Sequence, residues 1–145
     1  MKSAAIFFTY QVPRFRVRNS SPVKRWMLQA FRQEKKKLKQ LNVVFCSDKF
    51  LLDINKKFLK HNFHTDVITF QYNKKNAPVE GEIFISVEMV MANSKKFNAA
   101  FKDELHRVMI HGALHLCGYS DKTSAAKSLM QKRENKHLLQ RNFSA

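Results

Sequence analysis

Short β-rich runs alternate with longer stretches of helical periodicity along most of the chain. The runs with strand composition occupy residues 6–10, 41–46, 67–72 and 82–87. Apolar residues recur at helical spacing over 21–40, 48–59, 87–97, 102–117 and 123–139. Strands mixed with helices in this order predict an α+β fold, in which a mixed sheet of about four strands packs with about five helices.

Local signals mark where some of these elements begin and end. Ser21 followed by Pro22 predicts the N-cap and the first position of the first long helix, which we expect to reach about Gln40. The apolar positions within 12–17 could extend the first strand. With 145 residues, 3 glycines and 3 prolines, the sequence has little room for long linkers, and we expect one domain over residues 1–145.

The chain is strongly basic, with a formal net charge of +16 from 27 basic and 11 acidic residues. Residues 1–60 hold 15 of the basic residues and 3 of the acidic ones, 61–121 are nearly neutral, and 122–145 are basic again. Such a surplus attracts a polyanion, because each neutralised phosphate releases condensed counterions. Nucleic acid is the first candidate partner and an anionic membrane surface the second; a basic protein without such a partner is the alternative. The residues that we expect to contact a nucleic acid are Lys24, Arg25, Lys35, Lys36, Lys39, Lys60 and Lys122.

The chain has two cysteines, Cys46 and Cys117, which are too few for a disulfide framework and suit a reducing compartment. The apolar run near the N-terminus is shorter than the core of a signal peptide, and no stretch reaches the length of a membrane span. We therefore expect a cytoplasmic protein that does not enter a membrane.

Two histidines, His111 and His115, lie four residues apart in the helical stretch 102–117. This spacing places both imidazoles on one helix face, where a single helix can offer two nitrogen ligands to one metal ion. Gly118 is suited to end the helix, so Asp121 can supply a third ligand from beyond it. Three protein ligands leave the fourth tetrahedral position for water, as in catalytic rather than structural zinc sites.

The histidine pair also has a plain alternative, because two histidines at this spacing are often satisfied core or surface residues. Gly112 stands where zinc proteases with two helical histidines have a glutamate as general base. The pattern therefore disfavours a peptidase.

Three segments together resemble one known family, in its order and spacing. Residues 111–121 (HGALHLCGYSD) are similar to a motif that begins His-Gly-x-Leu-His-Leu-x-Gly-Tyr and ends in Asp-His. Residues 81–86 (GEIFIS) resemble a Gly-Asp-Ile-x-Ile-Ser strand, and residues 65–70 (TDVITF) resemble a Pro-Thr-Asp-Val-Leu-Ser-Phe segment. These are the motifs of the YbeY family of bacterial endoribonucleases, and the resemblance extends over about residues 41–139.

The resemblance implies a metal-dependent, single-strand-specific endoribonuclease that matures the 3′ end of 16S rRNA and takes part in ribosome quality control. It implies one zinc ion per chain, or another divalent metal, held by His111, His115 and Asp121. The implied partners are ribosomal RNA and the small ribosomal subunit, with a small-subunit ribosomal protein and the GTPase Era as further candidates. We expect a monomer.

The sequence departs from the family at three positions. Asp121 stands where the family has its third histidine ligand, and carboxylates are also common zinc ligands. Leu59 stands where the family usually has an arginine, so the role of that arginine cannot be carried over. Nearby basic residues could compensate, and the sequence does not select among Lys57, Lys60 and His61. His64 replaces a proline of the family, and we do not expect it to be a ligand.

Other side chains near the motifs have two interpretations each. Glu104 lies seven residues before the first histidine, and we expect it to act in catalysis with the two histidines, as an acceptor for a ligand imidazole or as a proton carrier. Otherwise it is a first-turn glutamate favoured by the helix dipole. Asp66 is either a cap or a site carboxylate. We expect Cys117 to be structural, and His106 and His137 to be surface residues.

Two rival functions stay open. One is a ribosome-assembly or RNA-binding factor without catalytic activity, in which the metal is structural; the loss of the family's arginine at Leu59 keeps this rival open. The other is a metal-dependent hydrolase of a small ester or peptide, which the positive charge and Gly112 disfavour.

Overall fold

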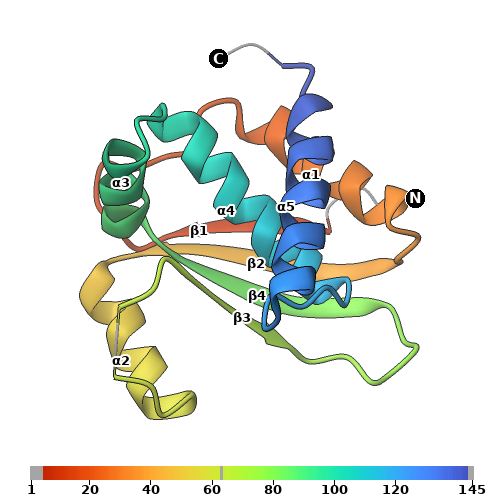
Figure 1. Cartoon of the computed structure of the whole chain (residues 1–145), viewed down its shortest axis with the longest axis horizontal. Helices are drawn as coiled ribbons and strands as arrows, with labels where there is room; N and C mark the ends of the chain where they lie inside the picture. The colour runs from red at the N-terminus through yellow and green to blue at the C-terminus, as the bar shows by residue number, and fades with distance from the viewer. Residues whose placement is uncertain (1–4, 63, 144–145) are drawn as a thin grey trace.

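A computed structural model describes residues 5–62 and 64–143. Within these ranges the chain forms four strands and five helices (Figure 1). The strands are β1 (Ile6–Tyr10), β2 (Leu38–Cys46), β3 (Val67–Gln71) and β4 (Val79–Ser86). The helices are α1 (Ser20–Gln33), α2 (Asp48–Phe58), α3 (Val87–Lys96), α4 (Phe101–Leu116) and α5 (Ser124–Leu139). The α+β architecture predicted from the sequence is confirmed.

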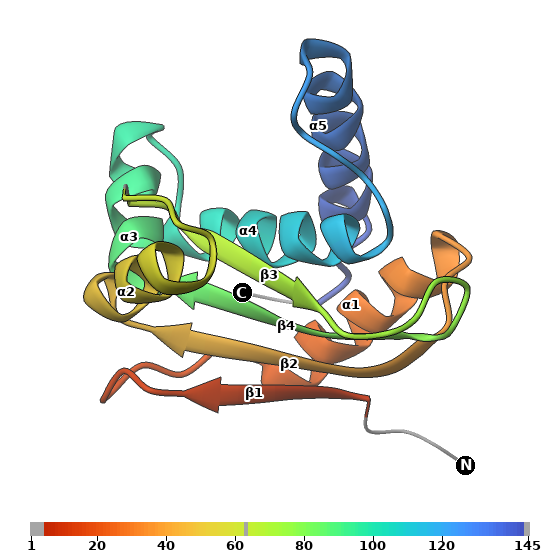
Figure 2. The same cartoon turned by 90° about the horizontal axis from the view of Figure 1, so that it is seen from below.

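The four strands form one mixed sheet in the order β1-β2-β4-β3. β1, β2 and β4 run parallel, whereas β3 is antiparallel to β4 and forms one edge of the sheet. In register, Phe8 pairs with Val43, Val43 with Ile83, and Ile83 with Thr69. Figure 2 shows α4 lying over the sheet, with α5 rising away from it.

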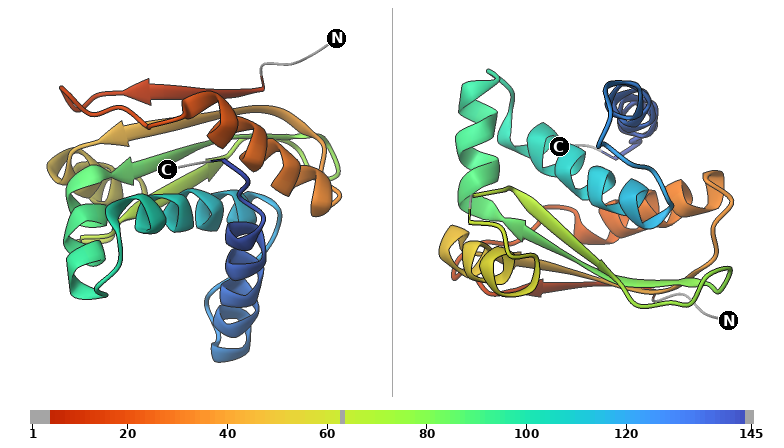
Figure 3. Two further views of the ribbon diagram at one scale, coloured as in Figure 1. Left: turned by 90° about the horizontal axis from the view of Figure 1, so that it is seen from above. Right: turned by 60° about the horizontal axis from the view of Figure 1, so that its bottom comes forward.

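The two faces of the sheet are covered by different helices. Leu41, Phe45 and Ile83 point to the face that α1 and α4 cover, and they belong to the main core. Both helices lie on the same side of the sheet in Figure 3. On the opposite face, Leu51 and Ile54 of α2 form a smaller core with strand residues. The described helices include none that is both long and apolar enough to cross a membrane.

A close contact between α4 and β4 places the end of α4 beside the sheet. A Cβ atom at Gly112 would lie 2.9 Å from Cγ2 of Ile83, so only a glycine lets the helix approach this closely. The helix ends at Leu116, and Gly118 follows with φ +107°, a left-handed conformation that glycine adopts without strain. The chain then turns back toward the helix, which brings Asp121 near its last turns.

The first helix differs from its prediction at both ends. It begins at Ser20 after Asn19, which takes a left-handed backbone, so Ser21 is not the N-cap. It ends at Gln33 instead of Gln40, because Lys35 has φ 60° and breaks the helical backbone. The prediction was wrong because Leu38 continues the helical apolar spacing, although it belongs to β2 and pairs with Val79.

Strand boundaries differ in two further places. β1 ends at Tyr10 and is not extended by residues 12–17, because the chain turns there and Arg14 takes φ 67°. β4 begins at Val79, three residues earlier than predicted. The reason is that the backbone N–H of Val79 donates a hydrogen bond to the carbonyl oxygen of Lys37 at 2.8 Å. Ser47 and Thr123 are the N-caps of α2 and α5, since each side chain accepts a backbone hydrogen bond in the first turn of its helix.

Candidate metal centre

His111 and His115 lie near the C-terminal end of α4, and Asp121 lies in the loop that follows. The Nε2 atoms of the two histidines are 3.0 Å apart, and Oδ2 of Asp121 is 3.4 Å from each of them. The three side chains predicted as ligands therefore meet at one point. All three are partly exposed, so this point is accessible from solvent.

The spacing of these atoms suits a tetrahedral metal ion. Bonds of about 2.0–2.1 Å at tetrahedral angles place neighbouring donor atoms about 3.3 Å apart. The 3.0 Å and 3.4 Å separations found here are close to that value. Two imidazoles and one carboxylate are a donor set of catalytic zinc sites, and three ligands leave one position open.

Each imidazole is oriented through its other nitrogen. Nδ1 of His111 lies 2.6 Å from Oε2 of Glu134, and Nδ1 of His115 lies 3.0 Å from the carbonyl oxygen of Tyr119. A carboxylate and a carbonyl only accept hydrogen bonds, so both Nδ1 atoms donate and both Nε2 lone pairs face the common point. This tautomer is the one that a metal ion between the two rings requires.

Glu134 was not anticipated from the sequence, because it lies on α5, 23 residues beyond His111, and no motif includes it. Its side chain is buried, and its second oxygen accepts a hydrogen bond from Arg107 at 2.8 Å. Burial alone would lower the pKa of His111, but the hydrogen bond and charge of Glu134, with the charges of Asp121 and Asp66, outweigh it and raise that pKa. The negative charges around this imidazole thus favour a cation at its Nε2 atom, where a bound metal ion would take the place of the proton.

The three ligand candidates line a cavity of about 310 Å³. Two other segments complete its wall: Asn55, Leu59 and His61 around the end of α2, and Thr65, Asp66 and Thr69 on β3 and the loop before it. Of the three basic residues considered as substitutes for the family's arginine, His61 is the one that lines the cavity.

Asp66 lines this cavity, as the interpretation of a site carboxylate requires. Burial raises its pKa, although the charge of His111 and a hydrogen bond from Asn93 at 3.4 Å act in the opposite direction. A carboxyl group that holds its proton more tightly than usual therefore faces the candidate metal centre.

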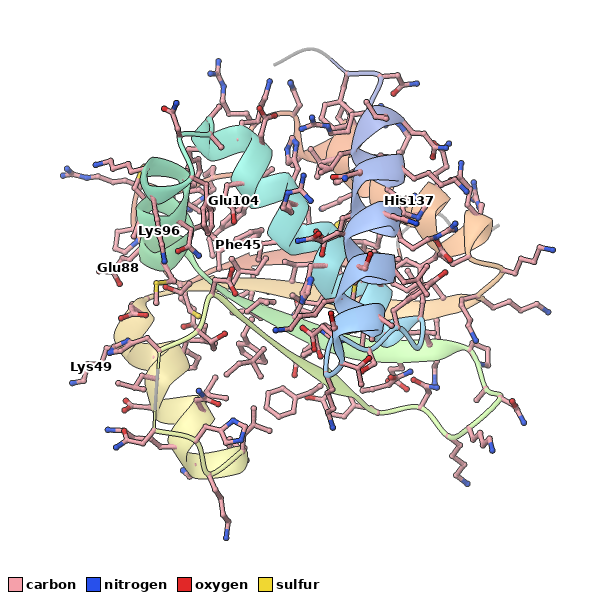
Figure 4. All side chains as sticks on the ribbon, viewed as in Figure 1. Phe45, Lys49, Glu88, Lys96, Glu104 and His137 are labelled. Atoms are coloured by element: carbon pink, nitrogen blue, oxygen red, sulfur yellow. The ribbon has the colours of Figure 1, made fainter. Side chains whose placement is uncertain are left out.

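Glu104 is buried on α4, at the position labelled in Figure 4. Within the described ranges it makes no side-chain hydrogen bond to His111 or His115, so the expected role as imidazole acceptor belongs to Glu134 instead. Burial, and next the charge of Asp66, raise the pKa of Glu104. Its catalytic role stays a prediction.

His106 and His137 are buried, so the expectation that they lie on the surface was wrong. His106 packs between Trp26 and Phe143, with ring centroids 5.5 Å from each, and burial together with the charge of Arg141 lowers its pKa to about 4. Neither histidine belongs to the candidate cluster found among the described residues. The apolar partners of His106 are distant in sequence, and its own neighbours gave no sign of them.

Two further residues agree with their predictions. Cys117 is buried outside the cluster of donor atoms, and burial raises the pKa of its thiol to about 12, as expected of a structural cysteine. His64 lies outside the cluster too, with its Nδ1 atom 2.6 Å from Oδ2 of Asp48.

A buried network behind the site fixes both imidazole acceptors. Glu34, just after α1, accepts hydrogen bonds from the Tyr119 hydroxyl at 2.7 Å, from two nitrogens of Arg133 at 2.7 and 3.2 Å, and from Nε2 of His137 at 2.7 Å. Tyr119 orients His115 through its carbonyl oxygen, while Arg133 and His137 belong to α5, which carries Glu134. The Glu34 network therefore holds the loop and the helix on which the ligand geometry depends.

The basic residues expected to contact RNA lie in three regions. Lys24 and Arg25 are on α1. Lys35 and Lys36 are in the turn before β2, and Lys39 is in β2. Lys60 and Lys122 directly follow the cavity-lining residues Leu59 and Asp121. Lys39 pairs with Glu80 at 3.7 Å. Among the described residues that line the cavity, none of these seven basic residues is included, and Lys60 and Lys122 are only sequence neighbours of the lining.

A small α+β domain with an open cluster of two histidines and one carboxylate has the donor set of a catalytic metal site. Comparison with protein families matches residues 11–142 to YbeY, described as Endoribonuclease YbeY. The chain belongs to the YbeY family, as the motifs in its sequence predicted.

Individual relatives cover nearly the whole chain. The Endoribonuclease YbeY of Cytophaga hutchinsonii is 40% identical over 143 residues, covering 99% of this chain and 100% of that protein. The Endoribonuclease YbeY of Karelsulcia muelleri is 42% identical over 129 residues, covering 89% and 91%. Among solved structures, the solution structure of TM1509 from Thermotoga maritima matches with a TM-score of 0.65 and 26% identity, covering 92% of this chain and 86% of that one.

Proposed function

We propose that this protein is a metal-dependent endoribonuclease that cuts single-stranded RNA, acting in maturation of the 16S rRNA 3′ end and in ribosome quality control. The observation that carries the proposal is the convergence of His111, His115 and Asp121 on one point of an open cavity. Family membership supports ribonuclease chemistry at that point, since its relatives are named endoribonucleases.

We propose zinc as the bound ion, with one ion per chain. The imidazole and carboxylate donors suit zinc, although the carboxylate makes the set harder and leaves room for another divalent metal. When bound, the ion would polarise a scissile phosphate or activate water. Glu134 and the Tyr119 carbonyl hold the two imidazoles in the required orientation before binding, so little reorganisation is needed.

Proton transfer at the cavity has two candidate side chains. The Asp66 carboxyl lines the cavity, and Glu104 lies close enough to Asp66 for their charges to interact. Both pKa values are raised, first of all by burial, so either carboxyl can hold a proton that the leaving oxygen of a cut strand needs.

Substitution of the third ligand tests this proposal. Asp121→Ala should lower the bound zinc measured by elemental analysis and should abolish RNA cleavage, and a chelator should do the same to the wild type. Full metal content with full activity in Asp121→Ala would contradict the assignment. Analysis of the product ends separates two routes, because a cyclic phosphate would show that the 2′-hydroxyl of the RNA attacks first.

A second candidate function is a ribosome-assembly factor that binds RNA without cutting it. One observation favours it: Leu59, an uncharged side chain, lines the cavity at the position where the family usually has arginine. In that case His111→Ala would lose the metal and lower the melting temperature, while the wild type would show no cleavage on any RNA.

We also propose the partners and location that accompany such a role. These are ribosomal RNA and the small ribosomal subunit, with a small-subunit ribosomal protein and the GTPase Era as further candidates, in the cytoplasm and with the protein as a monomer. Co-sedimentation of the tagged protein with small subunits from cell extract tests the ribosomal association.

A further inference from the structure

A second groove is lined by residues that follow shortly after those of the metal cavity on two segments of the chain. It has a volume of about 700 Å³ and is lined by Gln71, Asn73 and residues 75–79 on one side and by residues 116–118 on another. Thr69 and His115 line the metal cavity. Thr69 lies two residues before Gln71 of the groove, and His115 lies one residue before Leu116. The side-chain amide of Gln71 donates to the carbonyl oxygen of Leu116 at 3.2 Å and joins β3 to α4 at the residues of the groove that are next in sequence to the cavity lining.

The groove is positively charged. Four exposed lysines line it, Lys35, Lys36, Lys37 and Lys75. The described residues of its lining include no acidic one. None of the four forms a salt bridge with a residue in 5–62 or 64–143, in contrast to Lys39, which pairs with Glu80. The metal cavity itself contains carboxylates, so the positive charge that a polyanion needs lies in this neighbouring groove.

The walls of the groove are held in place by backbone contacts. The carbonyl oxygen of Lys37 accepts the hydrogen bond from the backbone N–H of Val79, which ties the lysine turn to the β3–β4 hairpin. The Asn73 side chain accepts from the backbone N–H of Glu80 at 3.1 Å within that hairpin. Glu34, the residue before the lysine run, is fixed by its buried network. A charged groove with a fixed shape binds with little ordering cost.

We propose that this groove binds the sugar–phosphate backbone of single-stranded RNA, on the stretch of the strand next to the phosphate that lies in the metal cavity. The inference rests on the proposed function, because RNA in the cavity is what gives the groove its ligand. The residues lining the groove include no aromatic side chain on which a base could stack, so the contacts are with phosphates and carry no base preference.

Two triple variants with the same change in charge test the proposal. The groove variant is Lys36→Gln/Lys37→Gln/Lys75→Gln. The control variant is Lys49→Gln/Lys95→Gln/Lys96→Gln, whose lysines are exposed on α2 and α3; Figure 4 labels Lys49 and Lys96, at the end of the molecule away from the β3–β4 hairpin. Binding of labelled single-stranded RNA of about 12 nucleotides is measured by fluorescence anisotropy over a range of salt concentrations.

The protein is kept in EDTA during these measurements, so that binding is observed without cleavage. Each lost phosphate contact reduces the slope of log K against log salt by about 0.7, so the groove variant should lose about 2 from that slope and roughly 100-fold in affinity at 0.1 M salt. The control variant should change the affinity by less than about threefold. Equal losses in both variants, or no loss in the groove variant, would overturn the proposal, as would equal binding of a duplex of the same length.

A cleavage assay with metal separates this proposal from the proposed function. If the wild type cuts no RNA while the groove variant alone loses binding, the nuclease proposal fails and the groove stands. If the wild type cuts RNA and the groove variant binds and cuts equally well, the groove proposal fails alone. With both correct, the groove variant should show a raised KM on long RNA and an unchanged kcat.

Discussion

Replacing Glu34 by glutamine tests whether the buried network behind the site stabilises the fold. The carboxylate of Glu34 accepts hydrogen bonds from Tyr119, Arg133 and His137, and its own side chain is only 5% exposed. Glutamine keeps the shape but removes the charge and turns an NH₂ group toward these donors.

The size of the effect follows from the burial of the two charges. Removing one partner of a buried ion pair costs about 3–5 kcal/mol, because the other charge is left unpaired. The side chain of Arg133 is 25% exposed and can partly rehydrate, so we expect Glu34→Gln to lower the free energy of unfolding by about 2–4 kcal/mol. In a domain of this size such a loss lowers the melting temperature by roughly 10 °C.

Thermal and urea unfolding followed by circular dichroism measure this loss. Glu80→Gln is the matched control, because Glu80 pairs with Lys39 on the surface at 3.7 Å, with both side chains exposed, and such pairs contribute about 0–1 kcal/mol. If Glu34→Gln costs no more than Glu80→Gln, the network does not stabilise the fold and the reasoning is wrong.

The loss should also depend on pH in a defined direction. Burial alone would raise the pKa of Glu34, but the hydrogen bonds from His137, Tyr119 and Arg133 outweigh it and lower that pKa. The stabilisation by this carboxylate is therefore complete above the ordinary glutamate pKa of 4.5 and is lost as the pH falls through the lowered value of the folded state. The difference in stability between wild type and Glu34→Gln should accordingly shrink in acid.

Three further predictions concern the site, the packing and the thiols. Glu134→Gln should weaken zinc binding about 10- to 100-fold in a chelator competition, because it removes the charge beside His111 and leaves one accepting oxygen where the carboxylate serves His111 and Arg107 with two; an unchanged affinity would show that the orientation does not depend on the carboxylate. Gly112→Ala should lower the free energy of unfolding by about 1–3 kcal/mol in urea titrations, since the new Cβ would meet Ile83 at 2.9 Å, and a neutral result would mean that α4 shifts at no cost. Cys117, whose thiol pKa is raised to about 12 by burial, should react with a thiol reagent only as fast as the protein opens, and fast labelling under native conditions would refute this.

The ligand cluster could be predicted from the sequence because it is local. His111, His115 and Asp121 lie within one helix end and the turn after it, so helical spacing and one glycine determine their relative positions. The acceptor that orients His111 lies 23 residues away, and the contacts of Glu34 span 85 residues to Tyr119 and 103 to His137. Pairings over such distances depend on how helices pack, which no local pattern encodes.

The errors in the first helix have a similar cause. Lysine is a good helix former, so the run from Lys35 to Lys37 gave no sign of a break, and Leu38 fitted both a helix face and a strand. What decides between them is the pairing of Leu38 with Val79, a contact made only when β4 is in place. His137 was assigned to the surface for the same reason, since its partner Glu34 comes from the other end of the chain.

The order in which the parts of the centre occur along the chain has a consequence for its assembly during translation. A growing chain that has left the ribosome as far as Asp121 already contains every donor atom, but it lacks Glu134, which aims one of the rings. The proposed metal would therefore bind at full strength only after the last helix has been made and has docked. If the proposed metal binds here, newly made chains should take it up tightly only as their final step, and a chain cut short before α5 should keep its ligands yet hold the ion poorly.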